Sequence, residues 1–156
     1  MEERKSMSHI RTPDIVKDRI EPEDSKIGQK IYNQYCVACH QNSGLGQTGQ
    51  FPPLAGSEWV LGNTEALSMI IHNGVAGKIE VAGTQYNGNM SAFGANLNAK
   101  ELAALMTYIR TSWGNDASIV SPSMAANALE ISKKRDGSQT SAEDLKKSHD
   151  KMLPGD

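Results

Sequence analysis

Cysteine, aromatic side chains and long apolar runs are all scarce in this 156-residue chain. With only Cys36 and Cys39, the chain cannot supply the four ligands of a structural zinc site, and a disulfide between them would stabilise little. No apolar run approaches the roughly 20 residues that cross a bilayer, and residues 1–20 lack the apolar core of a signal peptide. We therefore expect no transmembrane segment in this chain. The formal charge of −2 mixes both signs, so we also expect no nucleic-acid partner.

Both cysteines lie in one pentapeptide, CVACH at residues 36–40, which has the Cys-x-x-Cys-His pattern of covalent haem attachment. Cysteines three positions apart on one helical turn can each add to a vinyl group of the porphyrin, which places His40 beneath the iron. A thioredoxin-like motif would need a βαβ setting, whereas the flanks here are helical and rich in Gly, Asn and Gln. We therefore expect one haem c, bound through Cys36 and Cys39 with His40 as an iron ligand. The aromatic content of 5% suits a core partly filled by such a cofactor.

Composition divides the chain into three parts. Residues 1–24 are charged and irregular, which is typical of a flexible lead-in or linker. Residues 25–114 contain the haem motif and form the predicted haem domain. Residues 115–156 are a polar extension, with helices expected over 122–134 and 142–152.

Within the haem domain the apolar spacing is helical throughout. The spacing and caps predict helices over residues 25–40, 63–74 and 98–113, the last beginning with an Asn-x-x-Glu capping box. Gly-rich loops are expected over 41–56 and 75–97, and the second is long enough to suggest a functional loop. The predicted fold class is therefore all-α, with no sheet.

The sixth position on the iron requires a second ligand, and the sequence favours Met90. Of the seven methionines, Met69 and Met106 have the spacing of helix core residues, and four others lie in the lead-in or the extension. Met90 lies in the long Gly/Asn-rich loop, which can cross the far face of the haem. His72 is the rival ligand, although a histidine at the end of a helix more often stabilises the last turn.

Other residues near the motif have two interpretations each. A metal-bound histidine usually donates its second N–H to an acceptor, and the carbonyl groups of Pro52 and Pro53 are candidates, although a merely rigid turn is equally consistent. Trp59 and Tyr86 can hydrogen-bond a haem propionate, but ordinary packing is the commoner role for such residues.

The chain resembles the class I cytochromes c over residues 25–114. The matching residues flank the haem motif, share its first helix or lie in the last helix: Gly28, Tyr32, Pro52, Leu54, Leu105 and Tyr108. The resemblance implies three to four core helices wrapped round one covalent haem. It also implies that the Pro52 carbonyl, in the Pro-x-Leu that ends at Leu54, accepts a hydrogen bond from the ligand histidine.

Residues 51–62 and 86–115 are similar, more narrowly, to bacterial haem domains that serve membrane oxidases, quinol-oxidising complexes or periplasmic dehydrogenases. Those domains commonly have proline after the ligand methionine, where this chain has Ser91. The resemblance implies a one-electron carrier, not an enzyme, with such redox proteins as partners.

An alternative is that the chain is the soluble haem domain of a larger membrane-anchored or fused redox enzyme. Haem attachment of this kind takes place outside the cytoplasm, so we expect a periplasmic or otherwise extracytoplasmic protein, either free or held by an anchor that this chain lacks. We expect a monomer when the chain is alone. A haem enzyme or gas sensor would need an open iron, which a ligand at Met90 would close.

Overall fold

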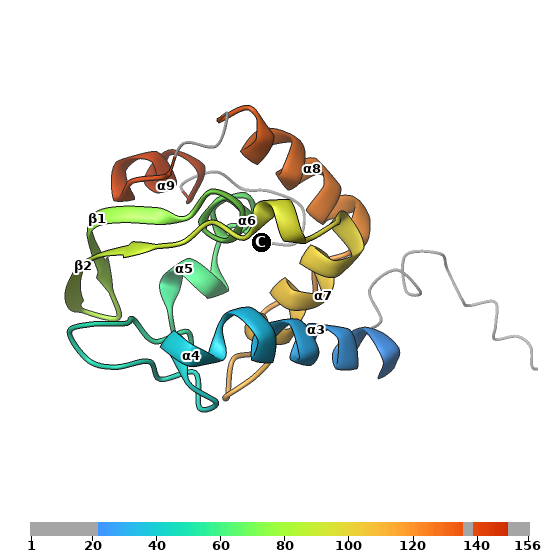
Figure 1. Ribbon diagram of the computed structural model, residues 1–156, viewed down its shortest axis with the longest axis horizontal. Coiled ribbons are helices and arrows are strands. Elements are labelled where there is room, and N and C mark those ends of the chain that lie inside the picture. The colour runs from blue at the N-terminus through green and yellow to red at the C-terminus, as the bar shows by residue number, and fades with distance from the viewer. Residues whose placement is uncertain (1–21, 136–138, 150–156) are drawn as a thin grey trace, which may run out of the picture.

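The computed structural model describes residues 22–135 and 139–149, so most of the predicted lead-in lies outside the described residues. In chain order the elements are α3 (Pro22–Tyr35), α4 (Val37–His40), α5 (Glu58–Leu61), α6 (Thr64–Asn73), β1 (Val75–Val81), β2 (Thr84–Met90), the 3₁₀ helix η1 (Gly94–Asn96), α7 (Ala99–Arg110), α8 (Pro122–Lys133) and α9 (Ala142–His149). Helices α3 and α4 lie at the bottom of Figure 1, with the two strands above them and α8 and α9 at the top. None of the described helices is long and apolar enough to cross a bilayer.

Helices α3 and α7 meet at a glycine. Gly28 approaches α7 so closely that a Cβ there would collide with the carbonyl oxygen of Ala104 and lie 2.8 Å from the Cβ of Tyr108. Beside this contact, Tyr32 and Leu105 are each only 1% exposed and belong to one core cluster. The contact packs α3 against α7, and the haem motif begins directly after α3 ends at Tyr35.

The helix predicted over residues 25–40 begins earlier, at Pro22, and is interrupted at Cys36, whereas the predicted starts at Asn63 and Asn98 are confirmed by their caps. The side chain of Asn63 accepts a hydrogen bond from the N–H of Ala66 at 3.0 Å. At the start of α7, Asn98 and Glu101 form a reciprocal capping box, with distances of 2.8 and 3.0 Å. Helix α7 ends at Arg110, a few residues earlier than the spacing predicted.

The described residues are mostly helical, as predicted, but the expectation of no sheet and of a loop over residues 75–97 is wrong. Strands β1 and β2 form an antiparallel hairpin in which Val75 pairs with Met90 and Val81 with Thr84. The two turn residues between the strands, Ala82 and Gly83, have φ values of 50° and 84°, as a tight hairpin turn requires. The many Gly and Asn residues of β2 concealed the strand, because its buried face carries few apolar residues.

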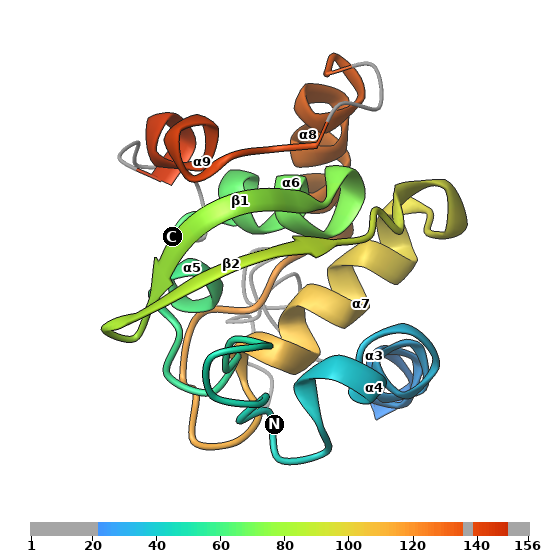
Figure 2. The ribbon, with the colours of Figure 1, turned by 60° about the vertical axis from the view of Figure 1, so that its left-hand side comes forward.

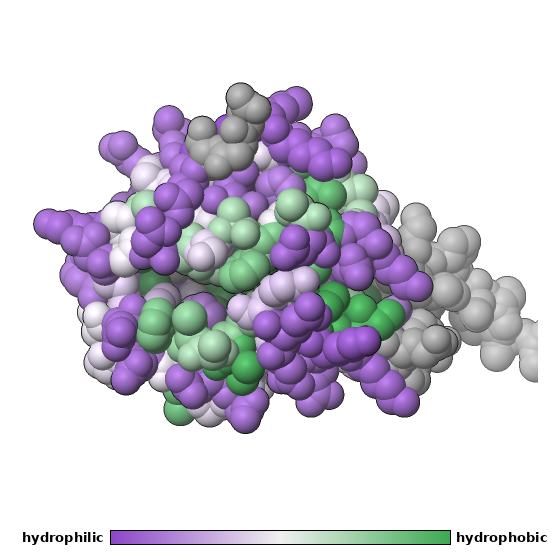
Figure 3. Space-filling model, in the orientation of Figure 1, coloured by the Kyte–Doolittle hydropathy of each residue, from purple (hydrophilic) through white to green (hydrophobic). Residues whose placement is uncertain are grey.

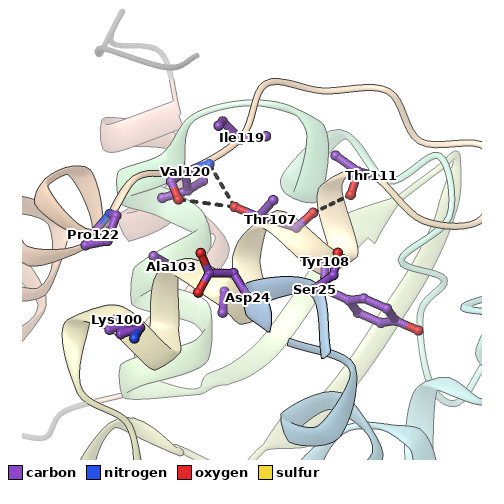
Figure 4. A pocket seen from close by; sticks show the side chains of 11 residues that line it. Asp24, Ser25, Lys100, Ala103, Thr107, Tyr108, Thr111, Ile119, Val120 and Pro122 are labelled. Carbon is purple, nitrogen blue, oxygen red and sulfur yellow. Dashed lines mark hydrogen bonds between the residues drawn. The ribbon is translucent and has the colours of Figure 1, made fainter. Parts of the chain in front are cut away.

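The C-terminal extension adds to the core. Helix α8 packs on α6 and α7, and α9 packs on α6 and β1. Val120 is 4% exposed and is joined to α7 by two hydrogen bonds with the hydroxyl of Thr107, at 2.9 and 3.2 Å. Figure 4 shows this pair beside a small cavity of about 80 Å³ between α7, the start of α3 and the segment that leads into α8. The end of the second predicted helix, residues 150–152, lies outside the described residues.

Candidate haem-binding site

The two cysteines lie where α3 ends and α4 begins. Cys36 is the N-cap residue of α4, and its carbonyl accepts hydrogen bonds from the N–H groups of Cys39 and His40 at 3.2 and 2.9 Å. Both thiols are free and half-buried. Burial, with a smaller contribution from Cys39, raises the pKa of the Cys36 thiol to about 12. The thiol is therefore protonated near neutral pH.

The imidazole of His40 is oriented by a backbone carbonyl. His40 is 7% exposed, and its Nδ1 lies 2.9 Å from the carbonyl oxygen of Pro52. This is the contact that the family resemblance implies, and it leaves Nε2 available to a metal. Burial lowers the pKa of His40, and the hydrogen bond to Pro52 opposes that shift only in part. The ring is therefore neutral near pH 7, which is the form that binds iron.

Two glycines hold the loop that supplies Pro52. Gly46 has a φ of 63°, and a Cβ there would collide with the carbonyl oxygen of Phe51 and lie 2.5 Å from that of Pro52. The N–H of Gly46 donates to the carbonyl of His40 at 3.0 Å, so the loop folds directly back on the ligand. Gly44 is covered by the ring of Trp113, whose indole N–H donates to the carbonyl of Asn42 at 2.7 Å.

Met90 is the last residue of β2, not part of an open loop. It is half-buried and packs against a second core cluster, which includes Trp59 and Tyr86. A Cβ on Gly74 would collide with the carbonyl oxygen of Met90, so the end of β2 lies tightly against the start of β1. Figures 1 and 2 both place β2 apart from α4, and Figure 3 shows a hollow on this face with apolar residues along its edges.

The remaining predicted site residues have packing contacts. Trp59 is 7% exposed, and its indole N–H donates to the carbonyl of Glu80 at 2.9 Å, which favours packing over a bond to a propionate. Tyr86 is buried in the same cluster, and Leu54 packs against the first core cluster.

The rival ligand, His72, lies at the end of α6 against the 3₁₀ helix η1. Its ring lies against Gly94, and its Nδ1 is buried without a hydrogen-bond partner among the described residues. Burial and the nearby charge of Lys133 lower the pKa of His72.

Sequence reasoning missed Arg110, which joins three segments. The side chain is 1% exposed and donates to the carbonyl groups of Val60, Gly62 and Ser118 at 3.0, 2.8 and 2.9 Å. A single arginine near the end of an amphipathic helix usually faces solvent, so no local signal distinguished it.

These features fit a covalently attached haem. Two half-buried thiols and a neutral, oriented imidazole lie together within α4 and its N-cap residue. The site is therefore that of a c-type haem protein. A profile of the family described as "Cytochrome c" matches residues 25–113, more than half of the chain. The chain belongs to the cytochrome c family, carries haem c through Cys36 and Cys39, and is an electron carrier, not an enzyme.

Proteins similar to this chain include a cytochrome c and the cytochrome c subunits of dehydrogenases. Cytochrome c-552 of Thermus thermophilus is 44% identical over 112 residues, which cover 69% of this chain and 83% of the relative. The "Alcohol dehydrogenase (quinone), cytochrome c subunit" of Gluconacetobacter polyoxogenes is 36% identical over 92 residues, 58% of this chain and 19% of the relative. The "Gluconate 2-dehydrogenase cytochrome c subunit" of Pantoea cypripedii is 31% identical over 101 residues, 61% of this chain and 22% of the relative.

Proposed function

We propose that this chain relays single electrons through a haem whose iron is held by His40 and Met90. The observation that carries the proposal is the 2.9 Å contact between Nδ1 of His40 and the Pro52 carbonyl, which leaves Nε2 available. Met90 is the best candidate for the opposite side, because it ends a strand at the margin of the core and is only half-buried. Met69 and Met106, by contrast, are 4% and 0% exposed within helices.

Haem c would supply the one-electron couple, and His40 and Met90 would hold its iron. His40 stays neutral because it is buried, and its hydrogen bond to Pro52 fixes the ring plane and raises its basicity. A neutral thioether opposite the imidazole raises the reduction potential relative to two imidazoles. With both of these side chains on the iron, no position would remain for oxygen or substrate.

The electron donor we propose is a dehydrogenase or a quinol-oxidising complex outside the cytoplasm, and the acceptor is a terminal oxidase. Two of the named relatives are cytochrome c subunits of dehydrogenases, which supports a donor of this class. The same observation supports a second candidate, in which this haem domain works inside a larger dehydrogenase assembly.

Replacing Met90 by alanine tests the ligand assignment. The variant Met90→Ala should lose the weak far-red sulfur-to-iron absorption band, and its potential should fall by a sizeable part of the roughly 0.8 V range that axial ligands span. The control is Met106→Leu, a volume-conserving change at a fully buried methionine, which should leave both unchanged. Retention of the far-red band in Met90→Ala would refute ligation by Met90.

A further inference from the structure

The segment that leads into α9 returns to the end of the hairpin that carries Met90. The side-chain amide of Gln139 donates to the side-chain oxygen of Asn89 at 2.7 Å and to the carbonyl oxygen of Met90 at 3.2 Å. Gln139 itself is exposed, and its carbonyl accepts a hydrogen bond from Arg135 at 2.8 Å. One side chain, 49 residues away along the chain, thus holds the backbone of the proposed iron ligand.

The next residue, Thr140, forms hydrogen bonds to the start of β1, beside the end of β2. Its N–H and its hydroxyl both donate to the carbonyl of Gly74, at 3.0 and 2.6 Å, and its own carbonyl accepts from the N–H of Ala76 at 3.0 Å. Val75 is therefore paired with Met90 on one side and with Thr140 on the other. Figure 2 shows the segment before α9 running beside β1. Because Thr140 is 1% exposed, these hydrogen bonds are protected from water.

Helix α9 anchors this segment. Leu145 is 0% exposed and packs in the cluster that also contains Val75 and Tyr86, against which Met90 lies. The start of the helix is fixed by reciprocal hydrogen bonds between Ser141 and Asp144 at 3.1 and 3.2 Å, and by an ion pair of Asp144 with Arg135 at 3.1 Å.

We propose that residues 139–140 are a positioning element for Met90 and set how firmly its thioether stays on the iron. The inference rests on the proposed ligation by Met90. A two-stranded hairpin is marginal by itself, and the end of β2 is followed by an exposed segment that begins with Ser91 in place of a stiffening proline. The hydrogen bonds from Gln139 reduce the freedom of the strand end at the residue whose side chain must reach the iron.

The test compares Gln139→Ala with Gln85→Ala in the haem-loaded, full-length protein. Gln85 is also exposed on the hairpin and makes only a 3.4 Å side-chain contact with Glu80, near the opposite end of β2. Imidazole, which competes for the sixth position, is titrated into the oxidised protein. In Gln139→Ala, loss of these hydrogen bonds should raise the apparent affinity of the protein for imidazole about fivefold and weaken the far-red band. Gln85→Ala should match the unmodified protein, and neither variant should change the urea midpoint substantially.

A second variant, Thr140→Val, keeps the buried volume while it removes the hydroxyl donor, and it should shift imidazole affinity in the same direction. Equal imidazole affinity in Gln139→Ala, Gln85→Ala and the unmodified protein, with the far-red band present in all three, would overturn the positioning role and leave ligation by Met90 intact. A rise in affinity that merely follows loss of global stability would also overturn it. If the unmodified protein lacks the band, both the ligation and the positioning element are refuted.

Discussion

At the scale of single residues, the orientation of His40 depends on a backbone carbonyl that only a glycine can accommodate. The Pro52 carbonyl lies between Nδ1 of His40 and the open side of Gly46, and there is no room on that side for a Cβ. A hydrogen bond from the free N–H of a ligand histidine raises the basicity of the ring and so favours the oxidised iron. The position of this carbonyl is therefore linked to the reduction potential.

The substitution Gly46→Ala should raise the reduction potential, because the new Cβ displaces the Pro52 carbonyl and weakens its bond to His40. It should also lower the free energy of unfolding by about 1–3 kcal/mol. The control is Gly49→Ala in the same loop, since Gly49 has a φ of 82° but no atom within 4 Å of an added Cβ. Potentiometric titration and urea unfolding measure the two effects, and equal potentials in the two variants would contradict this account.

At the scale of elements, the hairpin is held by a turn that one of its residues fits poorly. Ala82 has a φ of 50°, in the left-handed region, where a residue with a Cβ is strained by roughly 1–2 kcal/mol. Its N–H donates to a side-chain oxygen of Glu58 at 2.9 Å, which helps to hold the turn against α5. Asparagine and glycine adopt this conformation readily, so a substitution at this position can stabilise the turn.

We expect Ala82→Asn to raise the free energy of unfolding by up to about 1 kcal/mol. Ala82→Val should lower it, because a β-branched side chain tolerates positive φ least. Both substitutions keep the backbone N–H that bonds Glu58. Urea unfolding of the oxidised haem protein measures the difference, and a shift of both variants in the same direction would argue against a strained turn.

The elements also show which parts of the fold a sequence can predict. The helix starts at Asn63 and Asn98 were predictable because a cap is a local pattern of residues three positions apart. The hairpin was not, because its pairing is set by turn geometry and by burial of Val81 and Tyr86 with Trp59, while the composition of β2 is that of a loop.

Contacts between distant residues at the site could likewise not be predicted from local patterns in the sequence. The bond between His40 and Pro52 spans 12 residues and was suggested by the family resemblance, although the residues alone left it open. The bonds from Gln139 to Asn89 and Met90 have no local signature, because both partners are ordinary polar groups brought together only by the folded chain.

At the scale of the whole molecule, the C-terminal extension and the haem domain form one packed unit across the described residues. Arg110 and Thr107 join α7 to the segment at Ser118 and Val120, and Leu145 lies in the cluster beneath the hairpin. The charges are distributed unevenly over this unit. The loop over residues 41–56, which follows the haem motif, has no acidic or basic side chain.

This neutral loop predicts that electron transfer depends weakly on ionic strength. The oxidation rate of the reduced protein by hexacyanoferrate should change by less than about threefold between about 0.01 and 0.15 M salt, although the Debye length falls from about 30 to about 8 Å. The double variant Gln47→Lys, Gln50→Lys, at two exposed positions of the loop, should make the rate fall steeply with salt. A steep dependence in the unmodified protein would contradict this prediction.

The optical spectrum of the oxidised protein, followed by addition of carbon monoxide after reduction, tests the central claim most directly. Ligation of the iron by His40 and Met90 predicts a far-red sulfur-to-iron band and no change on addition of carbon monoxide, because both axial positions are filled. Absence of the band together with ready binding of carbon monoxide would contradict the account and would favour a haem with an open position.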